Sequence, residues 1–171
     1  MDDSQIEEVL SNIEATAGSL NYNRLSDTVA LVICDTNQIL NLSASPSNDR
    51  FYVINKLTPD CSAVGCVIDG ISDLHWYIRP EHRGKGYLTR ALSSTILKHI
   101  VQQSGRRCVR ISIATDEYSA YSKQSEKVAR SVGFRKVPVK RNTIIKNIRR
   151  QWFIYNPKTI KNKSASYDEK R

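Results

Sequence analysis

A short turn that joins an apolar stretch to a helical pattern constrains the fold more than any other feature of this sequence. The stretch Leu74–Ile78 has the composition of a strand, and the run Arg79-Pro-Glu-His-Arg-Gly-Lys-Gly86 separates it from a helical pattern that begins at Tyr87. Such a turn exposes backbone N–H groups that have no partner inside the helix, and the helix dipole adds partial positive charge to them. The sequence therefore predicts a phosphate or pyrophosphate site at this strand-to-helix junction.

The residues of the turn suit an anion. Gly84 and Gly86 carry no side chain that would keep an anion away from the backbone. Arg83 and Lys85 place fixed positive charge beside them. Helix-opening glycines also occur for packing reasons, so the loop has to be interpreted together with its surroundings.

Two better-known phosphate-binding loops are excluded because the sequence lacks residues that their motifs require. A P-loop would need glycine at position 79 and serine or threonine at position 86, where this chain has Arg79 and Gly86. A dinucleotide-binding loop that starts at Gly84 would need a small residue at position 89, which is Thr89.

The surroundings of the loop resemble those of the GNAT superfamily of N-acetyltransferases. The spelling Arg83-x-x-Gly86-x-Leu88 resembles the superfamily signature Gln/Arg-x-x-Gly-x-Gly/Ala, whose loop cradles the pyrophosphate of acetyl-CoA. The wider stretch Asp73–Leu92 is similar to the branch that acetylates the N-termini of ribosomal proteins, the Rim-type branch. A second patch, Ser125–Phe134, resembles a later element of the same branch.

The resemblance implies acetyl-CoA as co-substrate, with no metal. In the superfamily, backbone N–H groups of the strand before the loop stabilise the oxyanion and hydrogen-bond the pantetheine arm. Ser122 stands where the branch often has an asparagine, and its hydroxyl could still reach coenzyme A. The implied coenzyme contacts are Trp76, Tyr77, Ile78, Arg83, Gly84, Lys85, Gly86, Tyr87, Leu88 and Ser122.

Acetyl transfer to an amine needs a base, because an alkyl ammonium of pKa about 10 has no lone pair for the attack. Asp73 and His75 lie two residues apart in a strand pattern, so both side chains leave the same face, together with Tyr77. Asp73 also stands where the Rim-type branch often has a glutamate. One of the two is expected to act as base through a water molecule; alternatively, Asp73 caps a turn and His75 packs against Trp76.

The departing thiolate benefits from a proton donor. Many members of the superfamily use a tyrosine four residues before the glycine of the Gly-Phe pair, but this chain has Ala129 there. Ser125 matches a serine of the Rim-type branch whose hydroxyl is the proposed donor, and Tyr121, one turn earlier, is the substitute. Leu88 also departs from the signature, and it fits only if its side chain points inward as the first core residue of the helix.

Hydrophobic periodicity predicts helices and strands on both sides of the junction. Apolar residues at helical spacing predict an amphipathic helix from Ile6 to Ala17. Further helices are expected over residues 87–103 and 118–132. The expected strands cover residues 28–34, 51–57, 61–71, 73–78, 107–115, 134–139 and 143–155.

These elements predict an α/β (α+β) fold with a mixed sheet. A strand–helix–strand connection makes its two strands parallel, so the strands near residues 76 and 110 are expected to run parallel. Hairpin turns make the remaining strands antiparallel. The result is a mostly antiparallel sheet with a central parallel pair and flanking helices, which is also the acyl-CoA N-acyltransferase fold that the resemblance implies. The length of 171 residues favours one domain over 1–156, followed by a polar, basic tail over 157–171.

The composition bears on the partners and the compartment. The net charge is +9, and the stretch 135–171 is densely basic. Solubility together with attraction for the phosphates of coenzyme A is one interpretation of this excess, and RNA or a ribosomal surface is the alternative partner. No apolar run approaches the roughly 20 residues that cross a bilayer, and the acidic N-terminal residues do not resemble a secretory signal. The four cysteines are interpreted as buried free thiols, so a cytoplasmic protein is expected: Cys34, Cys61, Cys66 and Cys108.

The sequence therefore predicts an acetyl-CoA-dependent N-acetyltransferase that acts on a primary amine: a protein N-terminus, a lysine or a small molecule. A catalytically weak acyl-CoA sensor or interaction module is the first alternative, and Ala129 and Leu88 favour it. A toxin-like acetyltransferase that acts on aminoacyl-tRNA is the second. The acceptor and the oligomeric state are left open, although the last strand could mediate a homodimer.

Overall fold

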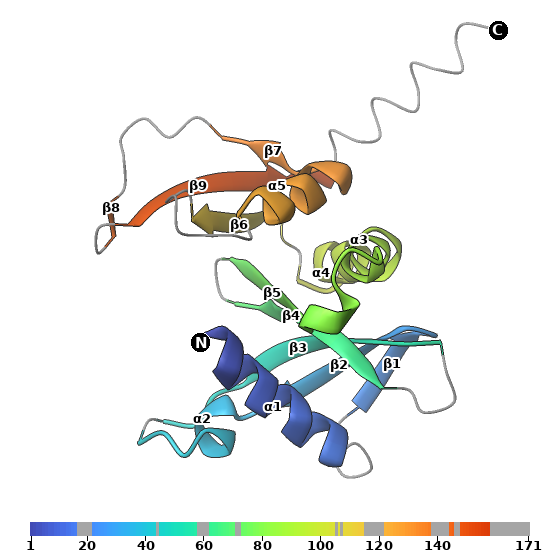
Figure 1. Cartoon of the computed structure of the whole chain (residues 1–171), viewed down its shortest axis with the longest axis vertical. Helices are drawn as coiled ribbons and strands as arrows, with labels where there is room; N and C mark the ends of the chain where they lie inside the picture. The colour runs from blue at the N-terminus through green and yellow to red at the C-terminus, as the bar shows by residue number, and fades with distance from the viewer. Residues whose placement is uncertain are drawn as a thin grey trace, which may run out of the picture. The chain divides into compact units, whose positions relative to one another are not determined.

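The computed structural model describes residues 1–16, 22–43, 45–57, 62–70, 73–104, 106, 108–114, 122–137, 144–145 and 148–157. The chain divides into two compact units, Met1–Ile96 and Leu97–Arg171 (Figure 1). The single domain predicted over 1–156 stays a prediction. None of the helices in these ranges is long and apolar enough to cross a membrane.

Five strands of the first unit form an antiparallel sheet in chain order. They are β1 (Tyr22–Ser26), β2 (Val29–Cys34), β3 (Asp49–Asn55), β4 (Ala63–Asp69) and β5 (Leu74–Ile78). The strands predicted from residues 28, 51, 61 and 73 onward are thereby confirmed. β1 was not predicted, because its sequence Tyr-Asn-Arg-Leu-Ser is polar and its residues are exposed or half-buried.

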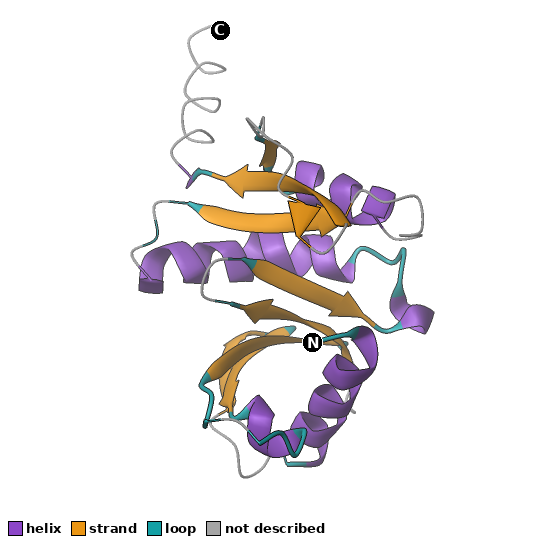
Figure 2. Cartoon of the chain, turned by 90° about the vertical axis from the view of Figure 1, so that its left-hand side faces the viewer, coloured by secondary structure: helices purple, strands orange, loops and turns teal. Residues whose placement is uncertain are grey.

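Helix α1 (Asp3–Ala15) packs against this sheet through the face that its periodicity predicts (Figure 2). Its residues Ile6, Val9, Leu10 and Ile13 are buried in one cluster with inward residues of β2 to β5. The carboxylate of Asp2 accepts hydrogen bonds from the backbone N–H of Ser4 and Gln5, so the helix begins with a capping box.

A second short helix was not predicted from the sequence. It is α2 (Thr36–Ile39), and it follows β2 directly. Asp35 caps it, because its Oδ1 accepts hydrogen bonds from the N–H groups of Asn37 and Gln38 at 3.1 and 3.2 Å.

The junction after β5 contains a 3-10 turn, η1 (Pro80–His82), and then α3 (Tyr87–Ala91) and a π-helical turn, η2 (Leu92–Ile96). Helix α4 (Leu97–Ser104) follows in the sequence and belongs to the second unit. The helix predicted over residues 87–103 is confirmed, whereas the π turn inside it was not predicted.

The second unit contains β6 (Val109–Ala114), α5 (Ser122–Ser131), β7 (Arg135–Lys136), β8 (Ile144–Ile145) and β9 (Ile148–Tyr155). β9 pairs antiparallel with β6, β7 and β8. Val109, Ile111 and Ile113 alternate along β6 and are buried, as the predicted strand requires.

The prediction that the cysteines are buried free thiols is confirmed only in part. Cys34 and Cys66 are free and buried, whereas Cys108 is free and exposed. The prediction that Cys108 is buried is therefore wrong, because the residue precedes β6 instead of lying within it. Cys61 and most of the predicted tail lie outside the described residues.

Candidate active site

Strand β5 carries His75, one of the two predicted base candidates, and three of the ten predicted coenzyme contacts, Trp76, Tyr77 and Ile78. His75 pairs with Ile68 and Tyr77 with Cys66 on β4, so both side chains leave the face of the sheet that α1 covers. His75 is exposed, whereas Tyr77 is buried. Asp73 precedes the strand and is half-buried, and its carbonyl accepts a hydrogen bond from the N–H of Gly70 at 3.2 Å.

The Tyr77 side chain is part of the core beneath α1. Burial, together with the neighbouring Glu7 carboxylate, raises the pKa of Tyr77 to about 12. The guanidinium carbon of Arg83 lies 6.0 Å from the centre of its ring. Tyr77 therefore offers a coenzyme its backbone and not its hydroxyl.

The two glycines of the loop adopt the left-handed conformation that glycine tolerates best. Gly84 has φ of 74° and Gly86 has φ of 75°. A Cβ on Gly84 would meet no atom within 4 Å, whereas a Cβ on Gly86 would lie 2.9 Å from Nη1 of Arg90. Both positions therefore favour glycine for the backbone, and at Gly86 an added Cβ would also displace the end of the Arg90 side chain.

The start of α3 is open to an anion. The backbone N–H of Arg90 donates to the carbonyl of Gly86 at 3.0 Å, which is the first hydrogen bond of the helix. No side chain caps this end. The N–H groups of residues 87–89 precede that bond, so the helix does not use them. Leu88 is 8 % exposed, and the inward orientation on which the resemblance depends is confirmed.

Two arginines of the turn, Arg79 and Arg83, bond to neighbouring segments and hold the loop in place. Arg79 donates from Nη1 to the Ala63 carbonyl at 2.8 Å, and its Nη2 lies 2.8 Å from Glu7 Oε1 and 2.8 Å from Glu14 Oε2 of α1. The hydrogen bonds with Glu14 and Glu7 raise the pKa of Arg79 above its usual range. The guanidinium therefore ties α1 to the strand ends next to the loop.

Arg83 also ties the loop to the end of β5 and to α1. Its Nε donates to the Ile78 carbonyl at 2.8 Å, and its Nη2 lies 3.7 Å from Asp3 Oδ2. Its role as a coenzyme contact stays a prediction, and this geometry assigns it a structural role in addition. Lys85, by contrast, is exposed beside the glycines.

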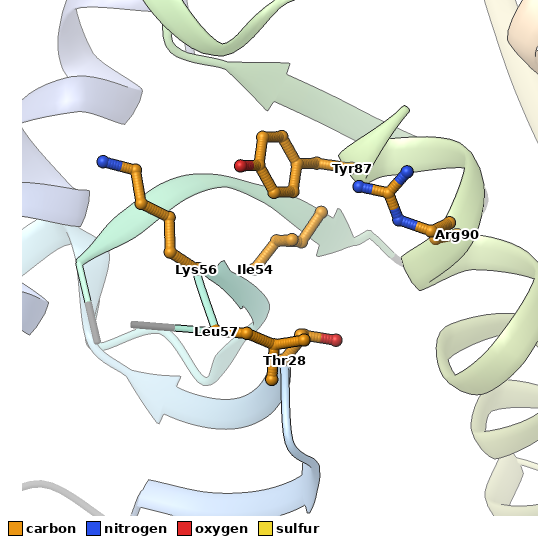
Figure 3. Close-up of a pocket in the computed structure, with 6 residues that line it drawn as sticks. All are labelled: Thr28, Ile54, Lys56, Leu57, Tyr87 and Arg90. Atoms are coloured by element: carbon orange, nitrogen blue, oxygen red, sulfur yellow. The ribbon is translucent and has the colours of Figure 1, made fainter. Parts of the chain in front are cut away.

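A cavity of about 320 Å³ adjoins the first turn of α3 (Figure 3). Its lining residues are Thr28, Ile54, Lys56, Leu57, Tyr87 and Arg90. Only Tyr87 among them was predicted as a site residue. The others come from three separate stretches of the sequence, Thr28, residues 54–57 and Arg90, and none of them was predicted as a site residue.

The predicted proton donors belong to the second unit. Ser122 begins α5, and Ser125 follows one turn later; both are half-buried. Ala129, at the position where many members of the superfamily have a tyrosine, is buried on the same helix. Tyr121 lies outside the described residues. The catalytic roles of Ser125 and Tyr121, and the coenzyme contact of Ser122, stay predictions.

Several solved structures to which this chain is similar are acetyltransferases. A variant of the spermidine N-acetyltransferase SpeG from Vibrio cholerae matches 96 % of this chain and 96 % of its own, at 12 % identity and a TM-score of 0.56. A GNAT-family acetyltransferase from Bacillus anthracis matches 78 % of this chain and 96 % of its own, at 11 % identity and a TM-score of 0.53.

The ribosomal-protein-S5-alanine acetyltransferase from Vibrio fischeri is also similar. It matches 63 % of this chain and 61 % of its own, at 13 % identity and a TM-score of 0.50. No protein-family model and no curated protein matches the sequence. The predicted fold class is confirmed by these structures: the chain has the mixed, mostly antiparallel fold of the GNAT acetyltransferases.

Proposed function

We propose that this chain is an acetyl-CoA-dependent N-acetyltransferase that acts on a primary amine. One observation carries the proposal beyond the fold. The start of α3 is uncapped and follows two left-handed glycines directly after β5, which gives a doubly charged pyrophosphate unused N–H groups and a positive helix end. A sensor that binds the coenzyme without turnover shares this loop, so activity has to be measured.

The proposed reaction assigns a task to each element. The backbone of residues 76–78 on β5 binds the pantetheine arm and polarises the thioester carbonyl. The N–H groups at the start of α3 bind the pyrophosphate. The positive charge of Lys85 adds to the attraction.

The chemistry itself moves one acetyl group and two protons. The acceptor ammonium first loses a proton to Asp73 or His75, directly or through water. The amine lone pair then attacks the thioester carbon, so that a C–N bond forms and the C–S bond breaks. The departing thiolate takes a proton, for which Ser125 is the proposed donor, and the second proton that the nitrogen loses as the amide forms restores the Ser125 hydroxyl.

The acceptor class and the partners are also part of the proposal. Protein N-termini, lysines and small amines are all primary amines, and the loop chemistry does not distinguish among them. The basic residues from 135 onward suit an acidic partner such as RNA or a ribosomal surface. A cytoplasmic location agrees with this assignment.

Gly86→Glu tests the loop. Glutamate at this position places a carboxylate where the pyrophosphate is proposed to bind, so we expect acetyl-CoA affinity to fall by at least about 100-fold in calorimetry. Gln102→Glu adds the same charge on the exposed side of α4 and serves as the control. Unchanged affinity in Gly86→Glu would remove the proposed pyrophosphate site.

A thiol-release assay separates an enzyme from a sensor. Purified protein is incubated with acetyl-CoA and a panel of primary amines, and free coenzyme A is measured over time. The proposal requires amine-dependent release that Gly86→Glu abolishes. Tight binding without release on any amine would favour the sensor.

A further inference from the structure

The cavity beside α3 has a lining that the proposed reaction does not use. Its walls come from the turn before β2, from the end of β3 and from the first turn of α3. None of its residues belongs to β5, the strand that is proposed to bind the pantetheine arm. A volume of about 320 Å³ is within the range of small-ligand sites.

Among the described residues, the lining carries positive charge and no carboxylate. Lys56 and Arg90 lie on opposite sides of the Tyr87 ring (Figure 3). In the described part of the chain, neither of them forms an ion pair with an acidic side chain. Two cations gathered around one cavity without a neutralising partner attract an anion and repel an amine.

Arg90 is held in a defined place. Its guanidinium carbon lies 5.2 Å from the centre of the Tyr87 ring, a distance at which the ring attracts a cation. Its Nη1 fills the space beside Gly86 where a Cβ would otherwise lie. A guanidinium oriented in this way presents its remaining N–H groups to an oxyanion, which favours phosphate.

The other walls suit a compact organic group. Ile54 is 1 % exposed and Leu57 is 74 % exposed, so one apolar side chain belongs to the core and the other is open to a ligand. Thr28 adds a hydroxyl that can donate to an anion. A bare inorganic ion would leave these apolar side chains without contact, whereas a phosphate on a small carbon skeleton would not.

We propose that this cavity binds a phosphate monoester, with the dianion between Lys56 and Arg90 and the organic part against Ile54 and Leu57. The phosphate monoester has two candidate sources. It is either the ribose 3′-phosphate of coenzyme A, in which case the inference rests on the proposed function, or a separate phosphorylated ligand, in which case it does not.

Calorimetry with matched probes tests the cavity. Coenzyme A is compared with dephospho-coenzyme A, which lacks only the 3′-phosphate, and phenyl phosphate is compared with phenol both with and without saturating coenzyme. The proteins are the unchanged chain, Lys56→Gln and Arg90→Gln. Lys98→Gln removes the same charge from the exposed side of α4 and is the control. Thermal melting of each variant checks that it is folded.

Two outcomes support the inference and identify the source. If the unchanged protein prefers coenzyme A over its dephospho form by about tenfold and Lys56→Gln loses that preference, the nucleotide supplies the phosphate. If Lys56→Gln instead weakens phenyl phosphate by about tenfold and leaves both coenzyme forms unchanged, a separate ligand does.

One outcome overturns it. Phosphate-dependent binding that is equal in the unchanged protein, in Lys56→Gln and in Arg90→Gln would show that the cavity does not bind phosphate. Failure of the proposed coenzyme site is recognised separately, because neither coenzyme form would then bind, while the phenyl phosphate comparison without coenzyme would still test the cavity.

Discussion

Arg79 offers the sharpest test of how the loop is supported, because one guanidinium joins three segments. Its side chain is 15 % exposed, and it forms ion pairs with Glu7 and Glu14 of α1, each with an N–O distance of 2.8 Å. It also donates to the Ala63 carbonyl at the start of β4, at 2.8 Å. We predict that Arg79→Met destabilises the protein and weakens the loop, since methionine keeps an apolar stem but none of these bonds.

The expected loss is about 3 kcal/mol in the free energy of unfolding. The two glutamates are 37 % and 33 % exposed, so water screens each ion pair, and we assign about 1 kcal/mol to each of them. The Ala63 carbonyl loses its charged donor, which costs about 1 kcal/mol more. In a chain of this length, a loss of that size lowers the Tm by about 6–12 °C.

Urea unfolding measures this loss against a matched control. Arg24→Met removes an ion pair with Asp27 that spans 3.6 Å between side chains 63 % and 86 % exposed, so we expect a change below about 0.5 kcal/mol. Glu7→Gln and Glu14→Gln complete a double-mutant cycle with Arg79→Met. A loss below about 1 kcal/mol for Arg79→Met would refute the support that we assign to this network.

Three further predictions concern the loop and the strand before it. Gly84→Ala should cost about 1 kcal/mol, because its Cβ meets open space and only the left-handed backbone is penalised; a stabilised variant in thermal melting would contradict this. The raised pKa of Tyr77, about 12, means that the folded state keeps a proton that the unfolded chain releases from about pH 10. The contribution of the Tyr77 proton to stability is therefore complete below pH 10 and is lost toward pH 12. Tyr77→Phe should remove this loss, about 2 kcal/mol, in urea unfolding. A pH profile identical to that of the unchanged protein would count against the prediction. Arg83→Gln should keep acetyl-CoA affinity within about threefold, because glutamine can still donate to the Ile78 carbonyl, whereas Arg83→Met should lose about tenfold; equal affinities in calorimetry would exclude this role.

The sequence predicted those parts of the fold that have a strong local pattern. The apolar face of α1 and the strands from β2 to β5 follow directly from periodicity, because burial of one face imposes a period on the sequence. β1 has no such period, since it is polar and is held by pairing with β2 instead of by burial. α2 also lacks an apolar period: it is held by its Asp35 cap, and Thr36 is its only buried residue.

The candidate site likewise has parts with a local sequence pattern and parts without one. The strand, the glycine turn and the start of α3 are consecutive in the sequence, so one motif was enough to predict them. The partners of Arg79 lie 72 and 65 residues earlier, in α1, and no local pattern joins them to it. Lys56 and Arg90 meet at one cavity for the same reason: the packing of α3 near the end of β3 creates it, and neither residue carries a motif.

The geometry of Arg83 also fits the signature that this loop resembles, whose first position is either arginine or glutamine. If this side chain served mainly to attract phosphate, glutamine would be a poor substitute, because it carries no charge. In this chain, Arg83 directs its Nε to the Ile78 carbonyl, and a glutamine amide can make the same kind of hydrogen bond. The requirement at this position is therefore a donor that closes the loop onto the end of β5. We therefore propose that the charge that attracts an anion comes from Lys85, from Arg90 and from the unused N–H groups of α3.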